Sequence, residues 1–151
     1  METISWTLKS FSELNPFELY QILRLRSEVF VVEQNCVFLD LDNLDAKSMH
    51  LQGRKDGELI AYVRILPPGL AYDEPSIGRV VTSPNARRTG AGKALMKKAI
   101  DETETMFPQK PIKIGAQLYL KKFYEGFGFE VCSEIYLEDG IDHIKMLRKY
   151  E

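Results

Sequence analysis

The chain has 151 residues, of which 44% are hydrophobic and 28% are charged. This length fits one globular domain over residues 1–151, and the composition is not that of a disordered chain. The formal net charge of -2 lacks the basic excess with which nucleic-acid-binding proteins displace phosphate counterions, so no nucleic-acid partner is expected.

Membrane and export segments are not recognisable in the sequence. No apolar run approaches the ~20 residues that cross a bilayer, and Met1–Phe11 lacks the basic leader and apolar stretch of a signal peptide. The two cysteines, Cys36 and Cys132, stand far apart and in no metal or redox spacing. We therefore expect a cytoplasmic protein with reduced thiols and no membrane partner.

The N-terminal part predicts a strand, a helix and a long loop. Apolar and polar residues alternate over Ile4–Leu8, as in a strand. Asn15 and Pro16 are typical of a helix N-terminus, and the apolar spacing behind them extends this helix to about Phe30. The segment Val31–Asp45 is irregular and acidic, which indicates a loop.

The middle of the chain predicts a hairpin, a strand and a long helix. Strands over Met49–Arg54 and Glu58–Leu66 flank a turn at Lys55-Asp56-Gly57. A further strand covers Ser76–Ser83. From Gly90 to Phe107 apolar residues recur at helical spacing, with charged residues on the opposite face.

The C-terminal part predicts a buried strand over Ile112–Ala116 and a short helix over Tyr119–Glu125. Strands Val131–Leu137 and His143–Arg148 then form a second hairpin. The order β-α-β-β-β-α-β-α-β-β predicts an α/β fold, in which a mixed sheet carries helices on both faces.

The clearest functional pattern lies in Gly78–Ala94, where a strand runs through a tight turn into the long helix. The first turn of a helix presents unpaired N–H groups and the positive end of the helix dipole, which suit a phosphate group. Gly90 and Gly92 let an anion approach the backbone without a Cβ in the way. Positive charge at the same turn comes from Arg87, Arg88 and Lys93.

Two common phosphate-binding motifs do not fit this segment. A Walker A loop requires glycine where Arg87 stands and Ser or Thr where Ala94 stands. A dinucleotide fingerprint requires Gly or Ala at the position of Leu95, in a turn that opens a βαβ unit. The residues alone leave two interpretations, an anion-binding helix N-terminus or a glycine-rich helix start with solvated arginines.

The segment Arg87–Gly92 (RRTGAG) resembles the acetyl-CoA signature of the GNAT superfamily of N-acyltransferases, Arg/Gln-x-x-Gly-x-Gly/Ala, between the expected strand and helix. Leu118–Phe129 resembles the second landmark of that family, a short helix with a tyrosine ahead of Gly-Phe. Further segments are similar to the ElaA-like branch of the family, namely Leu25–Gln34, Ile77–Val80, Gly115–Gln117 and Asp139–Ile144.

The resemblance implies the GNAT fold, a mixed and mostly antiparallel central sheet that splays between its fourth and fifth main strands. The pantetheine arm of acetyl-CoA enters this gap in the family and hydrogen-bonds along the fourth strand like an added strand. The cofactor-binding residues implied here are Val80, Val81, Thr82, Arg87, Arg88, Thr89, Gly90, Ala91, Gly92, Lys93 and Gln117. No metal is implied, and no metal-ligand set is visible.

The chemistry of the family requires an amine to attack a thioester. The amine must be neutral, the oxyanion must be stabilised, and the leaving thiolate must gain a proton. Tyr124 occupies the family's position for this proton donor, although the aromatic segment around it would also suit an ordinary buried tyrosine. The alternatives for the base are a water relay, Glu33 and His143.

The acceptor side is implied more weakly. Arg26, Glu33 and Gln34 lie where GNAT proteins shape the acceptor pocket, but such residues also occur on solvated helix faces. We expect Glu33 and His143 to share one pocket facing the thioester carbon, where Glu33 holds an acceptor ammonium and His143 accepts its proton. The acidic loop Leu39–Asp45 either selects a cationic acceptor or is merely solvated.

These observations predict an acetyl-CoA-dependent N-acyltransferase that transfers its acyl group directly to a small-molecule amine or a peptide. The rival hypothesis is a catalytically idle, regulatory acyl-CoA-binding module, which would keep Arg87–Gly92 but need neither Tyr124 nor an acceptor pocket. A phosphate-binding domain unrelated to CoA is disfavoured by the second landmark. The sequence leaves the acceptor and the oligomeric state open, a homodimer included.

Overall fold

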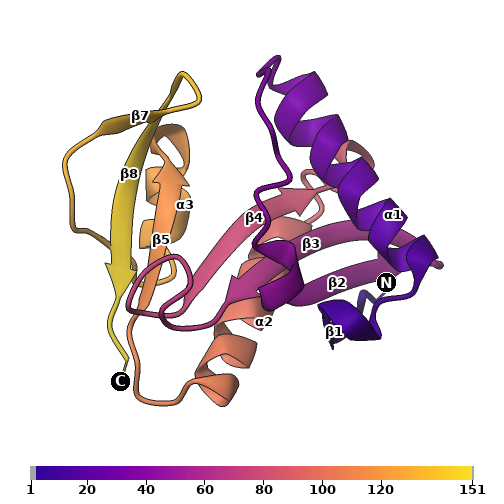
Figure 1. The fold of residues 1–151 in the computed structure, drawn as a ribbon, viewed down its shortest axis with the longest axis horizontal. Helices are drawn as coiled ribbons and strands as arrows, with labels where there is room; N and C mark the ends of the chain where they lie inside the picture. Colours follow the sequence, from indigo (N-terminus) through magenta and orange to yellow (C-terminus); the bar gives the residue numbers. More distant parts are fainter. Residues whose placement is uncertain (1–2, 151) are drawn as a thin grey trace.

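Two antiparallel sheets dominate the computed structural model, which describes residues 3–150 (Figure 1). The first sheet has the strand order β1-β2-β3-β4, and in the second β8 pairs with β5, β6 and β7. The strands of the first sheet are β1 (Ser5–Ser10), β2 (Met49–Lys55), β3 (Glu58–Leu66) and β4 (Ser76–Thr82). Those of the second are β5 (Ile112–Gln117), β6 (Glu130–Val131), β7 (Tyr136–Glu138) and β8 (Ile141–Arg148).

The two sheets meet at one end and diverge toward the other, so that β4 and β5 form a V (Figure 1). Near the closed end the Lys113 N–H donates a hydrogen bond of 3.0 Å to the carbonyl of Pro75, just before β4. Within residues 3–150 no strand ladder joins β4 to β5. The predicted splay between the fourth and fifth main strands is therefore confirmed.

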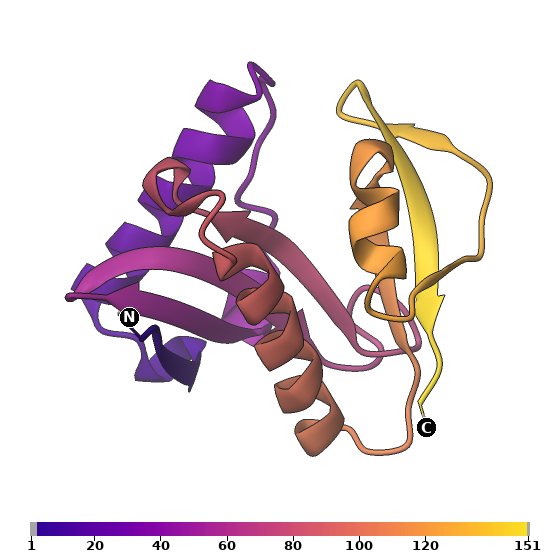
Figure 2. The same ribbon diagram turned by 180° about the vertical axis from the view of Figure 1, so that it is seen from behind.

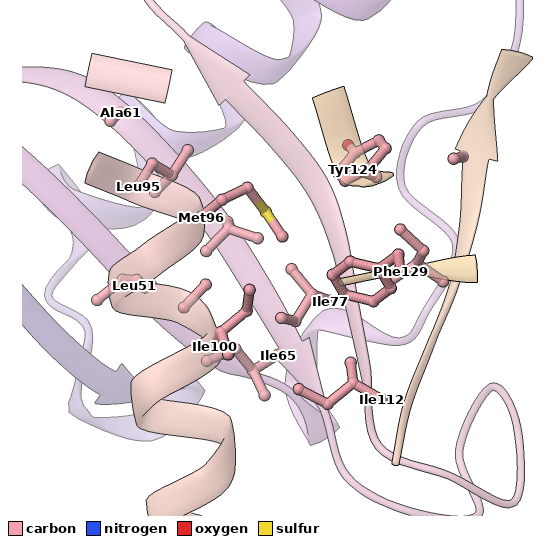
Figure 3. Close-up of a cluster of buried hydrophobic side chains, with 14 of the residues drawn as sticks. Leu51, Ala61, Ile65, Ile77, Leu95, Met96, Ile100, Ile112, Tyr124 and Phe129 are labelled. Atoms are coloured by element: carbon pink, nitrogen blue, oxygen red, sulfur yellow. The ribbon is translucent and has the colours of Figure 1, made fainter. Parts of the chain in front are cut away.

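Helices cover both faces of the first sheet (Figure 2). On one face, α2 (Ala91–Met106) packs its apolar side against β2, β3 and β4, and the same core includes Ile112 and Phe129 from the second half of the chain (Figure 3). This shared core holds the closed end of the V together. On the other face, α1 (Pro16–Arg26) buries Ile22 and Leu25 against β3 and β4.

The first helix begins where the sequence predicts and continues further than expected. The Asn15 side chain accepts a hydrogen bond of 2.8 Å from the Glu18 N–H, and the Glu18 carboxylate accepts one of 3.0 Å from the Asn15 N–H, which together cap α1. Beyond Arg26 the helix continues as a π-helix, η2 (Ser27–Glu33), instead of ending near Phe30. The wider π-helical turns, which often mark functional sites, carry the chain to the mouth of the V.

The C-terminal hairpin is less regular than predicted. In place of one strand over Val131–Leu137 there are two short ones, β6 and β7, separated by residues 132–135. The Ser133 hydroxyl accepts a hydrogen bond of 2.8 Å from the Lys145 N–H and so replaces a backbone carbonyl in the ladder. The turn between β7 and β8 is built by Asp139 and Gly140, whose positive φ angles of 52° and 77° are typical of tight hairpins.

The acidic loop is attached to the fold by buried ion pairs. The guanidinium of Arg26 is fully buried and donates hydrogen bonds of 2.9 Å to Asp40 and 2.7 Å to Asp45. Asp40 and Asp45 are themselves buried, and the pKa of Asp45 is lowered because the hydrogen bonds and charges of its arginine partners outweigh its burial. The three aspartates of Leu39–Asp45 are thus paired with arginines of the fold, while Leu39 and Leu41 of the same loop remain exposed.

Two further arginines complete this ion-pair cluster. Arg64, on β3, donates hydrogen bonds to Asp42 (2.8 Å) and Asp45 (3.0 Å). Arg79, on β4, donates one of 2.8 Å to Asp40. We call Arg26, Arg64, Arg79, Asp40, Asp42 and Asp45 the arginine–aspartate cluster. Its charges balance, and they join α1, β3 and β4 to one loop.

Replacing Arg26 by methionine should lower the free energy of unfolding by about 3–5 kcal/mol, because two buried carboxylates would lose a charged partner. Urea denaturation followed by circular dichroism would measure the loss. The matched control is Arg24→Met on the same helix. The Arg24 side chain is 69% exposed and, among the described residues, its one ion pair is with Glu28, so the loss should stay within about 0.5 kcal/mol. Equal stability of the two variants would contradict the structural role of the cluster.

Candidate active site

A cleft of about 760 Å³ opens between β4 and β5. Its walls come from both sheets, the end of η2, the acidic loop and the β7–β8 hairpin. The sequence-predicted residues that line it are Glu33, Gln34, Val80, Val81, Thr82, Arg87, Gly92, Gln117, Tyr124 and His143. Arg26 does not line the cleft and has no exposed surface with which to contact an acceptor, so its place is in the arginine–aspartate cluster.

The N-terminus of α2 faces one end of the cleft. Gly90 is its N-cap residue with a φ of 85°, a left-handed conformation that favours glycine, and no side chain caps the first N–H groups. A Cβ added at Gly92 would meet no atom within 4 Å, so packing does not require glycine there. An uncapped helix N-terminus beside open space can hold an anion.

The remaining residues of this turn lie outside the cleft lining but belong to the same helix start. Arg88 and Lys93 are exposed, whereas the Ala91 side chain is buried in the core. Arg88 also takes a positive φ of 64°, and the Thr89 hydroxyl donates a hydrogen bond to the carbonyl of Ala86, which fixes the shape of the turn. The turn therefore gathers positive charge in front of the free N–H groups.

Arg87 and Glu33 form a bidentate ion pair across the mouth of the cleft. The two terminal nitrogens of Arg87 donate hydrogen bonds of 2.6 and 2.5 Å to the two carboxylate oxygens of Glu33. The hydrogen bonds from Arg87 lower the pKa of the Glu33 carboxyl. Glu33 is consequently a weaker proton acceptor than a free carboxylate, and it has no free oxygen for an ammonium while this pair persists.

Two hydrogen-bonded contacts bridge the open end of the V. The side-chain amides of Gln34 and Gln117 exchange hydrogen bonds of 3.3 and 3.4 Å, which link the end of η2 to the end of β5. The Cys36 thiol donates a hydrogen bond of 3.3 Å to the carbonyl of Asp139, in the β7–β8 turn. The segment after η2 thus spans the cleft from one sheet to the other.

Tyr124 enters the cleft from α3 (Lys121–Glu125) and is 6% exposed. Its ring packs edge-on against Phe123, with a centroid distance of 5.3 Å. It also packs edge-on against Phe129, with a centroid distance of 6.1 Å (Figure 3). Burial, together with the nearby Tyr119, raises the pKa of its hydroxyl. Within residues 3–150 no hydrogen-bond partner holds this hydroxyl, so a protonated phenol is available to a ligand.

His143 lies on β8 with its imidazole buried at the cleft wall. Its Nδ1 is 2.8 Å from the carbonyl of Ile141, and its Nε2 is 3.4 Å from a carboxylate oxygen of Glu138. Sequence reasoning missed Glu138. The predicted hairpin could have indicated it, because Tyr136 pairs directly with His143 and Glu138, two residues on, lies on the same face as a diagonal neighbour.

The inner part of the cleft is aromatic, which the sequence also did not indicate. Tyr72, from the loop before β4, and Tyr136, from β7, both place their hydroxyls against Gly115 of β5. A Cβ at Gly115 would stand 3.0 and 2.9 Å from these oxygens, so a residue without a side chain admits them. No local pattern predicts the path of the loop that carries Tyr72.

Comparison with known proteins agrees with this geometry. Residues 39–150 match the family model described as an acetyltransferase (GNAT) domain. The chain belongs to the GNAT acetyltransferase family. It is 43% identical over 148 residues to protein ElaA of Escherichia coli strain K12, with 97% of each chain covered, which confirms the predicted ElaA-like resemblance.

Solved GNAT structures match nearly the whole chain. A crystal structure of an acyl-CoA N-acyltransferase from Pseudomonas aeruginosa superposes with a TM-score of 0.92 at 42% identity, covering 97% of this chain and 99% of that one. Escherichia coli ElaA superposes with a TM-score of 0.91 at 42% identity, covering 97% and 100%. The protein is accordingly an acyltransferase with the GNAT fold.

Residues 3–150 contain no group of three or more His, Cys, Asp or Glu side chains arranged to hold a metal ion. None of the helices in this part of the chain combines the length and apolar character that a membrane span requires.

Proposed function

We propose that the protein transfers the acetyl group of acetyl-CoA to the nitrogen of an amine by direct attack on the thioester. The observation that carries this proposal is that the uncapped N-terminus of α2 and the free Tyr124 hydroxyl open into one cleft. Acetyl-CoA carries a pyrophosphate at one end of its pantetheine arm and a thioester at the other, so a cleft with a phosphate-binding helix start and a proton donor suits it. The relative from Pseudomonas aeruginosa, named an acyl-CoA N-acyltransferase, supports the same reaction class.

The pyrophosphate of CoA would bind at the start of α2. Arg88 and Lys93 supply charge there, the backbone N–H groups from Thr89 to Gly92 supply donors, and the open space at Gly92 supplies room. Because Arg87 is engaged by Glu33, it can reach the pyrophosphate only by exchanging one anionic partner for another.

The pantetheine arm would lie along β4, which is the edge strand of the first sheet. A bulge interrupts its pairing with β3, because both Arg79 and Val80 face Val63 in the register. Arg79 takes a left-handed φ of 54°, and its side chain is held by Asp40. The outward edge of Val80–Thr82 can therefore hydrogen-bond to an extended ligand, with Gln117 opposite on β5.

Tyr124 would donate the proton that the leaving thiolate needs. Its raised pKa keeps the phenol protonated at neutral pH. The raised pKa also makes the phenol a weaker acid, and burial of the thiolate, which would raise the pKa of the thiol as well, would offset part of this effect. The acceptor would approach from the His143 side of the cleft, a space that an idle acyl-CoA-binding module would not require.

An acetyl-CoA turnover screen tests the proposed function. Thiol release would be followed with purified protein and a panel of arylalkylamines, polyamines, amino acids, aminoglycosides and peptides, and products would be confirmed by mass spectrometry. We expect at least one amine to be acetylated. Binding of CoA without acceleration by any member of the panel would favour the idle module instead.

Gly92→Glu should abolish measurable CoA binding, because it places a side chain and a negative charge where the pyrophosphate would lie. Isothermal titration calorimetry on the folded variant measures this. The control is Thr105→Glu, which adds the same charge at an exposed position near the other end of α2. Wild-type affinity in Gly92→Glu would disprove the pyrophosphate assignment.

Tyr124→Phe removes only the hydroxyl, so CoA affinity should persist while kcat falls by about ten- to a thousand-fold, in or below the usual range for a general acid. Steady-state kinetics with an amine identified in the screen would measure the change. Tyr20→Phe, on the exposed side of α1, serves as control and should keep wild-type kcat. An unchanged kcat in Tyr124→Phe, with chemistry shown to limit the rate, would remove this residue from the mechanism.

Glu33→Gln should strengthen CoA binding by about two- to five-fold, because Arg87 would no longer have to leave an exposed carboxylate. Calorimetry at low ionic strength would measure the dissociation constant. Glu28→Gln removes the same charge from the same helical segment, at an equal side-chain exposure of 42%; Glu28 pairs with Arg24 and acts on Arg87 through its charge, more weakly than Glu33 does. Equal affinities of the two variants would indicate that Arg87 does not change partners.

A further inference from the structure

The hydrogen bonds of His143 determine which ring nitrogen can accept a proton. Its Nδ1 lies 2.8 Å from the carbonyl of Ile141, and a carbonyl oxygen only accepts, so Nδ1 must carry a hydrogen. In the neutral ring Nε2 is then the atom with the free lone pair. Nε2 lies 3.4 Å from the Glu138 carboxylate, which would stabilise the imidazolium formed when Nε2 is protonated.

The carboxylates of the cleft differ in whether a cation already occupies them. Glu33 is paired with Arg87, and Asp42 is paired with Arg64 and Arg79. Within residues 3–150, Glu138 forms no ion pair with a lysine or arginine, and its one ion-pair contact is with His143, which is a cation only when both ring nitrogens carry a proton. Glu138 and Asp139 are the lining carboxylates for which residues 3–150 show no lysine or arginine ion pair, and Glu138 is the one that contacts the imidazole, so it is best placed to hold a cation beside that ring.

The cleft surface near His143 favours an apolar body on that cation. The Tyr136 ring lies 5.8 Å from the imidazole, and Ile141 and Tyr72 line the same cavity. The cleft arginines are engaged by carboxylates, so none is free to hold an acceptor carboxylate. Glu138 would also repel such a group.

We propose that the acceptor is a primary amine with an aromatic or apolar body and no adjacent carboxylate, that Glu138 binds its ammonium, and that His143 Nε2 is the general base. This assignment rests on the proposed function and gives it an acceptor class and a base. It also replaces Glu33 as the residue that holds the ammonium, because Glu33 pairs with Arg87 whereas Glu138 lies beside the imidazole that would take the proton.

The protons balance as follows. The ammonium loses one proton to His143 Nε2, which releases it to solvent. The neutral nitrogen attacks the thioester carbon, so that the C–N bond forms and the C–S bond breaks. The thiolate takes a proton from the Tyr124 phenol, and the second proton lost by nitrogen returns to Tyr124. The products are the amide, free CoA thiol and one proton.

Imidazole NMR tests the binding site without relying on turnover. The chain has only two histidines, and His50 is a built-in control because it is buried and lies 2.9 Å from the carbonyl of Asp45. The probes are 2-phenylethylamine and L-phenylalanine, which differ by one carboxylate, each added to histidine-labelled protein saturated with CoA. We expect the His143 resonances, assigned with His143→Gln, to shift with 2-phenylethylamine and not with phenylalanine. No shift with the amine, or equal shifts with both, would overturn the site.

Kinetics with an amine from the turnover screen test the roles of the two residues. His143→Gln should lower kcat by about a hundred-fold or more, as loss of a general base does, and leave CoA affinity unchanged. Glu138→Gln should mainly raise the KM for the amine, up to about five-fold for an exposed charge pair. Glu134→Gln, an exposed carboxylate outside the cleft lining, is the control and should change neither value.

The outcomes separate this inference from the proposed function. A wild-type kcat in His143→Gln would disprove the assignment of His143 as general base and leave the acyltransferase proposal intact. Absence of turnover with every amine would overturn the acyltransferase proposal, whereas the NMR titration would still decide whether Glu138 and His143 form an amine site. Loss of the amine-induced shift in Glu138→Gln, with CoA still bound, would support the assignment of the ammonium partner.

Discussion

The arginine–aspartate cluster is the constraint on which the cleft depends. Its cations come from α1, β3 and β4, whereas all its carboxylates come from residues 40–45. Burying an isolated charge costs several kcal/mol. Detaching the loop from the sheet would leave the buried arginines without their carboxylate partners, so the loop is held in place. Since the loop is fixed, the segment before it is also fixed, and Gln34 and Cys36 are held in reach of the second sheet.

The two ends of the V are held by interactions of different strength. At the closed end Ile77, Ile112 and Phe129 share one apolar core, and burial of such side chains contributes about 1.5–3 kcal/mol each. At the open end the bridges are neutral hydrogen bonds, each worth about 1 kcal/mol net. Opening at the ligand-binding end is therefore far less costly than separation of the sheets.

Local patterns in the sequence predicted most of the fold and the glycine-rich, basic start of α2, but not the ion pairs and aromatic side chains that line the rest of the cleft. The strand Glu58–Leu66 and the cap at Asn15 follow from periodicity and residue type, which act over a few positions. Arg26 could not be placed in this way, because the local sequence does not distinguish a helical arginine that is solvated from one that pairs with Asp40. The break between β6 and β7 depends on Ser133 meeting a strand 12 residues away. The place of Arg26 and the break between β6 and β7 both depend on partners distant in sequence.

The sequence separations within the cluster have a consequence for the order of folding. Asp40 bonds to a residue 14 positions before it and to another 39 positions after it. The second of these contacts closes a long chain loop. The chain loses the conformational entropy of this loop before the stabilising contact can form. Helix and hairpin formation are local events that can precede this step. The wall of the cleft formed by the loop at residues 40–45 would accordingly be assembled late, and recovery of secondary structure on refolding would run ahead of recovery of a complete cleft.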